Sequence, residues 1–286
     1  MTDDIERAPA FISPTDACDS HFHVFGEKGR YPYSGKLRYE PPHAPWENYA
    51  KWAEHVGISR WVFVQPSAYG TDNSCMLDTM KQVGVKHCRG IIDLEPGTSA
   101  NSLAAWHQLG VRGIRINVSP IHPMDSLLCS RMQSHIANMD ALCHEMGWHL
   151  DFLLPGWLTY EMIPTFERLK VPHSLAHMGM FLAREGSNQI GFQALLKLMQ
   201  TGRTWVKFTG TYRMGTAPGF TDVKPMAQAL IKSAPNRIIW GSDYPHLSFA
   251  HTVGSTQLFN LLGEWAPEES IRKLILKDNP QELYGF

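Results

Sequence analysis

Short apolar runs of strand length alternate along the chain with segments whose apolar residues recur at helical spacing. The first run covers residues 16–21, and a second at 61–65 (WVFVQ) ends at a proline. Between them, residues 46–56 carry tryptophan, tyrosine and valine three or four positions apart, which is typical of a helix. Six further strand-like runs follow, at 87–93, 111–118, 148–154, 173–177, 204–209 and 237–242.

Eight strand-like runs separated by helical patterns predict a parallel β-sheet, because parallel strands need a long crossover that is usually a helix. The later helical patterns cover 76–83, 99–109, 131–146, 158–169, 189–201, 222–234, 252–263 and 267–277. The count of eight favours closure into a barrel, and no GxGxxG follows the first strand to indicate a dinucleotide site. We expect one α/β domain, residues 1–286, with an N-terminal arm (1–15) and a long loop (26–46).

Composition argues against several classes of function. The 26 Lys and Arg residues and 27 Asp and Glu residues give a formal net charge of -1, which offers no basic surface to nucleic acid or an anionic membrane. No apolar run is long enough to span a bilayer, and the acidic N-terminus lacks the apolar core of a signal peptide. The five cysteines contain no CxxC pair, as in reduced proteins. We therefore expect a soluble, cytoplasmic protein with a small-molecule ligand; its oligomeric state is open.

His21 and His23 stand at the end of the first predicted strand, with one residue between them. Alternate side chains of a strand share a face, so both imidazoles can converge on a metal ion or on the polar end of a substrate. Chemistry in α/β barrels lies where the strands end. Polar residues occupy other predicted strand ends as well: Gln65, Arg115, Asn117, His177, Lys207, Asp243 and His246. The pattern predicts a ligand site at these ends.

Four segments, in this order and spacing, resemble the amidohydrolase superfamily: DSHFHVFG (19–26), LAHMG (175–179), WVKFTG (205–210) and WGSDYPH (240–246). More narrowly, they resemble its lactone-hydrolysing branch, which includes 2-pyrone-4,6-dicarboxylate lactonase and sugar-acid lactonases. Further similarity lies in YGTDN (69–73) and RGIRIN (112–117). The resemblance implies a distorted (β/α)8 TIM barrel with a hydrolytic site at the C-terminal ends of its strands.

The resemblance also implies roles for individual residues. His21 and His23 match the histidine pair of the first strand, and His177 matches the histidine of the family's HMG turn. Asp243 matches the aspartate after the last strand, which in this family takes the proton from the attacking water. Lys207 falls where relatives carry a lysine on the seventh strand. The implied reaction is the opening of a lactone by water that Asp243 activates.

Two departures from the branch bear on the substrate. The pyrone dicarboxylate lactonases carry an arginine after HMG, where this chain has Met180, and Pro-Asn after the final histidine, where it has Leu247 and Ser248. Arg213, by contrast, matches an arginine that grips a carboxylate in those enzymes. One carboxylate contact is kept and another is lost, so we expect a less charged substrate, such as a lactone with a single carboxylate.

The histidines leave two interpretations of the site open. As neutral imidazoles, His21, His23 and His177 could join Asp243 around one Zn²⁺, which would polarise the carbonyl or activate water. Without a metal, they would donate hydrogen bonds to the lactone carbonyl. The resemblance favours the metal-free form, because the branch contains metal-independent members. A two-metal site is not expected, since the fourth strand has no lysine that could bridge two ions.

Candidate substrate-binding residues are Arg115, Asn117, Lys207, Arg213, His246 and Tyr69. Arg115 and Asn117 share one face of the fourth strand, and Arg213 could bind a carboxylate bidentately. Lys207 lies in an apolar strand, where a lysine needs a partner, so a structural ion pair is an alternative role. Asp151 could also point into the barrel, and its role is left open.

We therefore predict a hydrolase that opens a carboxylated lactone. A zinc-dependent non-oxidative decarboxylase of an unsaturated or aromatic acid is an alternative, because that branch shares the HxH pair, the strand-six histidine and the late aspartate. A lactone isomerase, in which the same base moves an acyl group between hydroxyls, is a second. A barrel that only binds a sugar acid would need no base at Asp243.

Overall fold

Eight β-strands follow one another along the chain in a computed structural model that describes residues 5–34 and 37–286. Residues 1–4 of the predicted arm and 35–36 of the predicted loop lie outside the described residues. The strands are β1 (Ala17–Phe22), β2 (Ile58–Val64), β3 (Cys88–Ile92), β4 (Val111–Asn117), β5 (His149–Leu153), β6 (His173–Leu175), β7 (Thr204–Phe208) and β8 (Ile238–Trp240).

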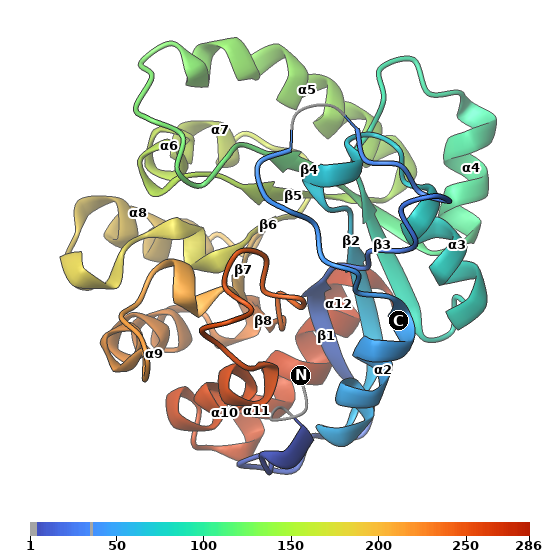
Figure 1. Ribbon diagram of the computed structural model, residues 1–286. Helices are drawn as coiled ribbons and strands as arrows, with labels where there is room; N and C mark the ends of the chain where they lie inside the picture. The colour runs from blue at the N-terminus through green and yellow to red at the C-terminus, as the bar shows by residue number, and fades with distance from the viewer. Residues whose placement is uncertain (1–4, 35–36) are drawn as a thin grey trace. The chain divides into compact units, whose positions relative to one another are not determined.

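The sheet order is β1 to β8, so strands that neighbour each other in the sheet are also consecutive in sequence. The pairs β1–β2, β2–β3, β4–β5, β5–β6 and β6–β7 are parallel. Helices stand between the strands, as Figure 1 shows along the colour gradient. Parallel strands in chain order with helical crossovers define a (β/α)8 barrel, which confirms the predicted fold class.

The helices are α2 (Trp46–His55), α3 (Ser74–Val83), α4 (Ala100–Gln108), α5 (Leu128–Met146), α6 (Gly156–Glu161), α7 (Ile163–Phe166), α8 (Ile190–Met199), α9 (Lys224–Ser233), α10 (Ser255–Trp265), α11 (Glu269–Lys273) and α12 (Asn279–Tyr284). Helix α2 forms where the apolar residues recur at helical spacing, and it buries Tyr49, Trp52 and Ala53. Within residues 5–34 and 37–286, no helix is both long and apolar enough to cross a membrane.

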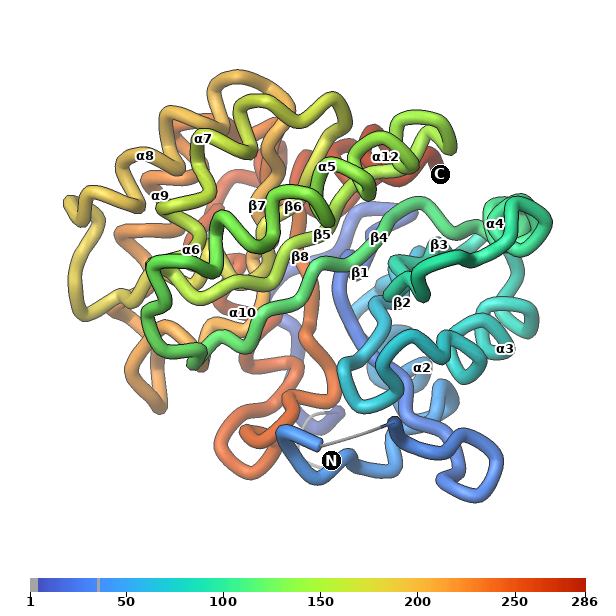
Figure 2. The backbone as a smooth tube through the Cα atoms, turned by 90° about the horizontal axis from the view of Figure 1, so that it is seen from above, coloured from blue at the N-terminus to red at the C-terminus, as the bar shows by residue number. Residues whose placement is uncertain are grey.

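The chain divides into two compact units. Unit 1 comprises Met1–Arg112 and Trp240–Phe286, and unit 2 comprises Gly113–Ile239. Unit 1 contains β1, β2 and β3, and unit 2 contains β5, β6 and β7, while β4 and β8 run from one unit into the other. The backbone trace in Figure 2 follows α2 and α3 beside the strands β2 and β3 of unit 1. The expectation of a single domain stays a prediction.

The core of unit 1 is rich in aromatic residues. Phe22 of β1 stacks on Tyr49 of α2, with ring centroids 4.0 Å apart, and lies 4.6 Å from the ring of Phe63 on β2. Burial of aromatic rings contributes strongly to stability and fixes the elements that carry them. Strand β1 is therefore anchored through Phe22, and the residues on either side of it point away from that contact.

Strand β6 is shorter than predicted. It ends at Leu175, and His177 lies in a 3₁₀ turn, η2 (His177–Met180), instead of on the predicted strand 173–177. His177, Met178, Gly179 and Met180 all have positive φ angles, between 49° and 72°. A β-strand requires negative φ, so the strand stops before these residues.

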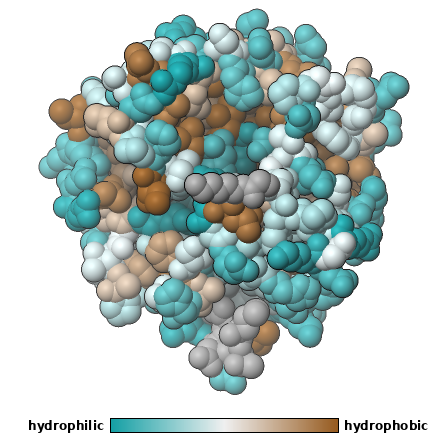
Figure 3. All heavy atoms as spheres, turned by 45° about the horizontal axis from the view of Figure 1, so that its top comes forward, coloured by the Kyte–Doolittle hydropathy of each residue, from teal (hydrophilic) through white to brown (hydrophobic). Residues whose placement is uncertain are grey.

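A few large apolar side chains of the described residues are exposed. Figure 3 presents a mostly hydrophilic face with scattered hydrophobic residues. Among the described residues, the most exposed large apolar side chains are Ile12, Ile121, Met124 and Ile190. Single apolar side chains on a surface are ordinary in proteins.

Candidate active site

Strand β1 carries two histidines to its end in unit 1. His21 and His23 lie on either side of Phe22, whose ring stacks on Tyr49 in the core. Because alternate side chains point to opposite faces, both imidazoles lie on the face away from that aromatic contact. Both are buried, with 0% and 3% exposure. His23 lies one residue beyond β1, and the register of β1 against β2 shifts between Asp19 and Phe22, so the two imidazoles stand at an irregular strand end.

The loop after β8 brings a carboxylate to these imidazoles. The Nε2 atoms of His21 and His23 each lie 3.6 Å from Oδ1 of Asp243, and the two rings are nearly perpendicular, at 80°. One ligand atom from each of the three residues lies within 4.8 Å of the others. Asp243 is buried as well. Unit 1 thus unites three of the four predicted catalytic residues.

The orientation of His23 is fixed by a backbone carbonyl. Its Nδ1 lies 2.7 Å from the carbonyl oxygen of Val64, which can only accept, so Nδ1 carries a proton. In a neutral imidazole the lone pair then lies on Nε2, the atom that faces Asp243. Two acceptors facing each other at this distance repel unless a proton or a cation lies between them.

This arrangement fits a zinc ion. Tetrahedral ligand atoms with bonds of about 2.1 Å lie about 3.4 Å apart, close to the observed N–O separations. Those separations are 3.6 Å for both histidines. Two imidazoles and a carboxylate are also ligands that zinc prefers. His21, His23 and Asp243 could therefore hold a metal ion.

Backbone hydrogen bonds align the Asp243 loop with β1. Asp243 N donates to the His21 carbonyl at 2.9 Å, and His23 N donates to the Tyr244 carbonyl at 2.8 Å. Gly241 makes this close approach feasible, since a Cβ there would lie 2.6 Å from His21 Cβ. Asp243 itself has a φ of 57°, in the left-handed region that non-glycine residues seldom adopt.

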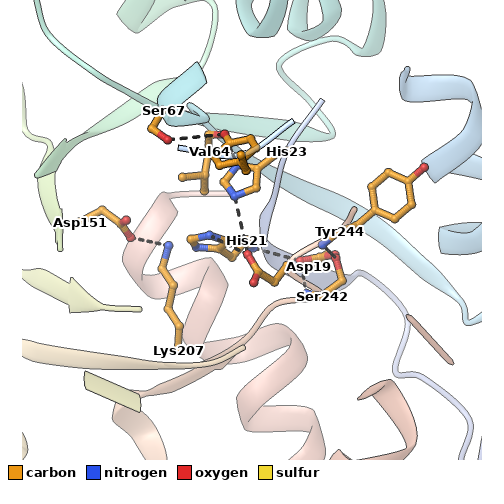
Figure 4. Close-up of polar contacts among 11 residues, drawn as sticks. Asp19, His21, His23, Val64, Ser67, Asp151, Lys207, Ser242 and Tyr244 are labelled. Atoms are coloured by element: carbon orange, nitrogen blue, oxygen red, sulfur yellow. Dashed lines mark hydrogen bonds and ion pairs between the residues drawn. The ribbon is translucent and has the colours of Figure 1, made fainter. Parts of the chain in front are cut away.

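A fourth residue of unit 1, Asp19, was missed by sequence reasoning. Its Oδ1 accepts hydrogen bonds of 3.0 Å from the backbone N–H groups of His21 and Ser242, and its Oδ2 accepts one of 2.8 Å from the Tyr49 hydroxyl. Figure 4 shows Asp19 beside Ser242 and His21. Burial raises the pKa of the Asp19 carboxyl to about 6, although these hydrogen bonds oppose the rise. The register of β1 against β2 shifts between Asp19 and Phe22, so strand parity gave no signal for this contact.

The other predicted residues of unit 1 make contacts within the protein. Gln65 donates to the carbonyls of Gly70 and Asp72 and so fixes the loop after β2. The buried hydroxyl of Tyr69 accepts from the backbone N–H of Gly26. The Nε2 atom of His246 lies 2.7 Å from Ser255 Oγ, at the start of α10. Roles of Tyr69 and His246 in substrate binding stay predictions.

In unit 2, His177 is buried at the start of the η2 turn. Its ring lies against Gly210, which follows β7: a Cβ at Gly210 would come within 2.3 Å of His177 Nδ1. Any larger residue at Gly210 would displace the imidazole. The pairing of His177 with the residues of unit 1 stays a prediction.

Unit 2 also contains a buried ion pair. Lys207 of β7 contacts Oδ2 of Asp151 on β5, both are fully buried, and Ser174 Oγ donates to the same oxygen at 2.7 Å. Figure 4 shows the ammonium directed at the carboxylate. Burial would raise the pKa of Asp151, but the charges of Lys207 and Arg115 and the hydrogen bonds outweigh it, and the pKa is lowered. This contact gives Lys207 the partner that its burial requires.

The remaining predicted residues also belong to unit 2. Arg115 is buried on β4 and pairs in register with Asp151 of β5, and Asn117 ends the same strand. Arg213 ends a short 3₁₀ turn, η4 (Thr211–Arg213), with its guanidinium carbon 5.2 Å from the centroid of the Tyr212 ring. Their contact with a substrate stays a prediction.

The chain belongs to the amidohydrolase family, whose model (Amidohydrolase) matches residues 18–286. It is 33% identical to the 4-sulfomuconolactone hydrolase of Hydrogenophaga intermedia, over 96% of this chain and 90% of the relative. It is 29% identical to a 2-pyrone-4,6-dicarboxylate hydrolase of Comamonas testosteroni, over 96% and 92%.

A similar solved structure is that of a Pseudomonas putida protein assigned as a candidate 2-pyrone-4,6-dicarboxylic acid hydrolase. Its TM-score is 0.79 at 28% identity, and the match covers 95% of this chain and 98% of that one. The two curated relatives carry the names of lactone hydrolases. Together, these comparisons confirm the resemblance that the sequence motifs indicate.

Proposed function

We propose that the protein is an enzyme that hydrolyses a carboxylated lactone with Asp243 as the base. The observation that carries the proposal is the convergence of His21, His23 and Asp243, with both N–O separations at 3.6 Å in a buried setting. The lactone hydrolases among its relatives support the reaction type. A cytoplasmic location and the absence of a nucleic-acid partner stay predictions from composition.

The proposed reaction needs a base for the attacking water and hydrogen-bond donors for the lactone carbonyl oxygen. Asp243 accepts a proton from water while the water oxygen attacks the lactone carbonyl, and donor groups stabilise the resulting oxyanion. The tetrahedral intermediate then expels the ring oxygen, which takes the proton from Asp243. The product is an open hydroxy acid. His21, His23 and His177 are proposed as the donors to the lactone carbonyl.

A zinc ion held by His21, His23 and Asp243 is the alternative to the metal-free site, because the geometry of these residues fits it. A bound zinc would supply Lewis-acid polarisation of the carbonyl or a more acidic water. Measurement of zinc per chain, together with activity before and after chelation, distinguishes the two forms. Activity that is lost on chelation and restored by zinc would refute the metal-free form and support the zinc form.

The substrate is proposed to carry one carboxylate. The proposed contacts to the substrate are Arg115, Asn117, Lys207 and Arg213, of which Arg213 would bind the carboxylate. Asp151 holds Lys207 in place. Met180 follows HMG, at the position where the family resemblance implies an arginine in the pyrone dicarboxylate lactonases. An apolar side chain there supports a substrate with fewer negative charges than a dicarboxylate.

The test is a screen of mono- and dicarboxylated lactones in water enriched in oxygen-18. Hydrolysis places one solvent oxygen in the product, whereas isomerisation incorporates none and decarboxylation releases carbon dioxide. Asp243→Asn should lower kcat by about 10² to 10⁴, the usual contribution of a general base. Asp278→Asn is the control, since this exposed carboxylate pairs with Lys273. Full activity of Asp243→Asn would refute the assigned base.

A further inference from the structure

Asp19 is a buried carboxylate that the proposed reaction does not use. It is fully buried at the middle of β1, two residues before His21. Burial of a carboxylate is unfavourable unless hydrogen bonds compensate, and here three residues donate hydrogen bonds to it. The donors are the backbone N–H groups of His21 and Ser242, the side chain of Ser242 and the hydroxyl of Tyr49.

The two backbone donors belong to the segments that carry the candidate site. One is the N–H of His21 itself, and the other is the N–H of Ser242, the residue before Asp243. A single oxygen, Oδ1, binds both at 3.0 Å. Figure 4 shows Asp19 joining these two segments. Asp19 therefore fixes the separation between the strand that carries the imidazoles and the loop that carries the carboxylate.

The loop needs such an anchor because its backbone is strained. Asp243 and His246 have positive φ angles of 57° and 61°. Residues other than glycine are held in this region only where their surroundings determine it. The hydrogen bond from Ser242 N to Asp19 and that from Asp243 N to the His21 carbonyl are consecutive restraints on the entry to this turn.

We propose that Asp19 is a positioning residue, which sets the distance from Asp243 to the imidazoles of His21 and His23 by binding the backbone of both segments with one oxygen. It does not touch the substrate. Its effect on turnover rests on the proposed lactone hydrolysis, whereas its effect on the histidine environment does not.

Three variants separate this role from its alternatives. Asp19→Asn keeps an acceptor oxygen in place but removes the charge. Asp19→Glu keeps the charge but displaces the oxygen by one methylene group. Tyr49→Phe is the matched control, because it removes one side-chain hydrogen bond of the carboxylate and retains both backbone bonds and the stacking on Phe22.

The first measurement is kcat and KM for a lactone substrate, well below the melting temperature of each variant. Asp19→Glu should lose about 10- to 100-fold in kcat, as is usual when a residue that orients a site is changed, with KM within about threefold. Asp19→Asn should retain kcat within about fivefold, and Tyr49→Phe should match wild type, as the hydrogen-bond geometry of each dictates. If Asp19→Glu does not fold, Asp19→Ala replaces it.

The second measurement is NMR of protein labelled with ¹³C at histidine Cε1, with His21 and His23 assigned from their glutamine variants. Their resonances should move in Asp19→Glu and stay in place in Tyr49→Phe. Wild-type kcat and unchanged resonances in Asp19→Glu would overturn the proposal, as would an Asp19→Asn enzyme as impaired as Asp19→Glu. Shifted resonances in a protein that hydrolyses no lactone would support the positioning role and refute the proposed function alone.

Discussion

The buried pair of Lys207 and Asp151 predicts a large loss of stability when one partner is removed. Lys207→Met leaves a carboxylate with 0% exposure, supported by Ser174 but without its ammonium. Breaking a buried pair in this way costs about 3–5 kcal/mol. At about 1.4 kcal/mol for each factor of ten, the lower value reduces the folding equilibrium about 150-fold. The melting temperature should fall by about 6–10 °C.

Thermal and urea unfolding provide the assay, and a double-mutant cycle provides the decisive comparison. Asp151→Asn combined with Lys207→Met removes both charges, so it should be more stable than Lys207→Met alone. The lowered pKa of Asp151 means that the pair stabilises the protein above the usual aspartate pKa and that this contribution is lost as the pH falls through the lower native pKa. In the variant Lys207→Met, the free energy of unfolding should not show this decrease at low pH.

Lys81→Met is the surface control, because Lys81 is 56% exposed and pairs with Asp78. An exposed pair contributes at most about 1 kcal/mol. A Lys207→Met variant no less stable than Lys81→Met would refute the reasoning, since it would mean that the buried carboxylate loses nothing when its ammonium is removed.

Two further predictions concern the β1 end. Gly241→Ala should lower kcat by at least about tenfold, because the added Cβ meets His21 within 2.6 Å and a misplaced catalytic group is costly; Gly29→Ala, which has open space, is the control and should match wild type. The pKa of Asp19, about 6 against an ordinary 3.8, means that the native state binds more protons than the unfolded chain between these values. Stability contributed by this group should therefore fall by about 3 kcal/mol as the pH rises from about 4 to 7, and urea unfolding should show that Asp19→Asn lacks this fall.

The series of eight strands and the histidine pair at the end of the first one could be predicted because both depend on local periodicity, whereas Asp243 was predicted from the family resemblance of WGSDYPH. Strand-length apolar runs gave eight strands, and the two-residue spacing of His21 and His23 placed both imidazoles on one face. The apolar character of β7 likewise indicated that Lys207 needs a partner. Its identity, Asp151, depends on the register of β5, β6 and β7, which periodicity along one strand does not contain.

The proposed positioning role of Asp19 could not be predicted, because the two donors that carry it are backbone N–H groups. Ser242 lies 223 positions further along the chain, and its N–H carries no side-chain signature. The end of β6 was misjudged for a related reason: four consecutive positive φ angles follow Ala176, and three of them belong to residues other than glycine. Turns of this kind are determined by tertiary contacts more than by local preference.

The hydrogen bond from His23 to Val64 restricts how the candidate site can work. With the Nδ1 proton committed to the Val64 carbonyl, the Nε2 atom of a neutral His23 can accept but cannot donate. Donation from this atom to a lactone carbonyl therefore requires the imidazolium form, whereas zinc binding requires the neutral form. The imidazolium in the metal-free form, or the ion in the zinc form, would place positive charge beside Asp243, whose Oδ1 lies 3.6 Å from His23 Nε2. The metal-free and zinc forms thus differ in the charge of His23, and Asp243 is the proposed base in both.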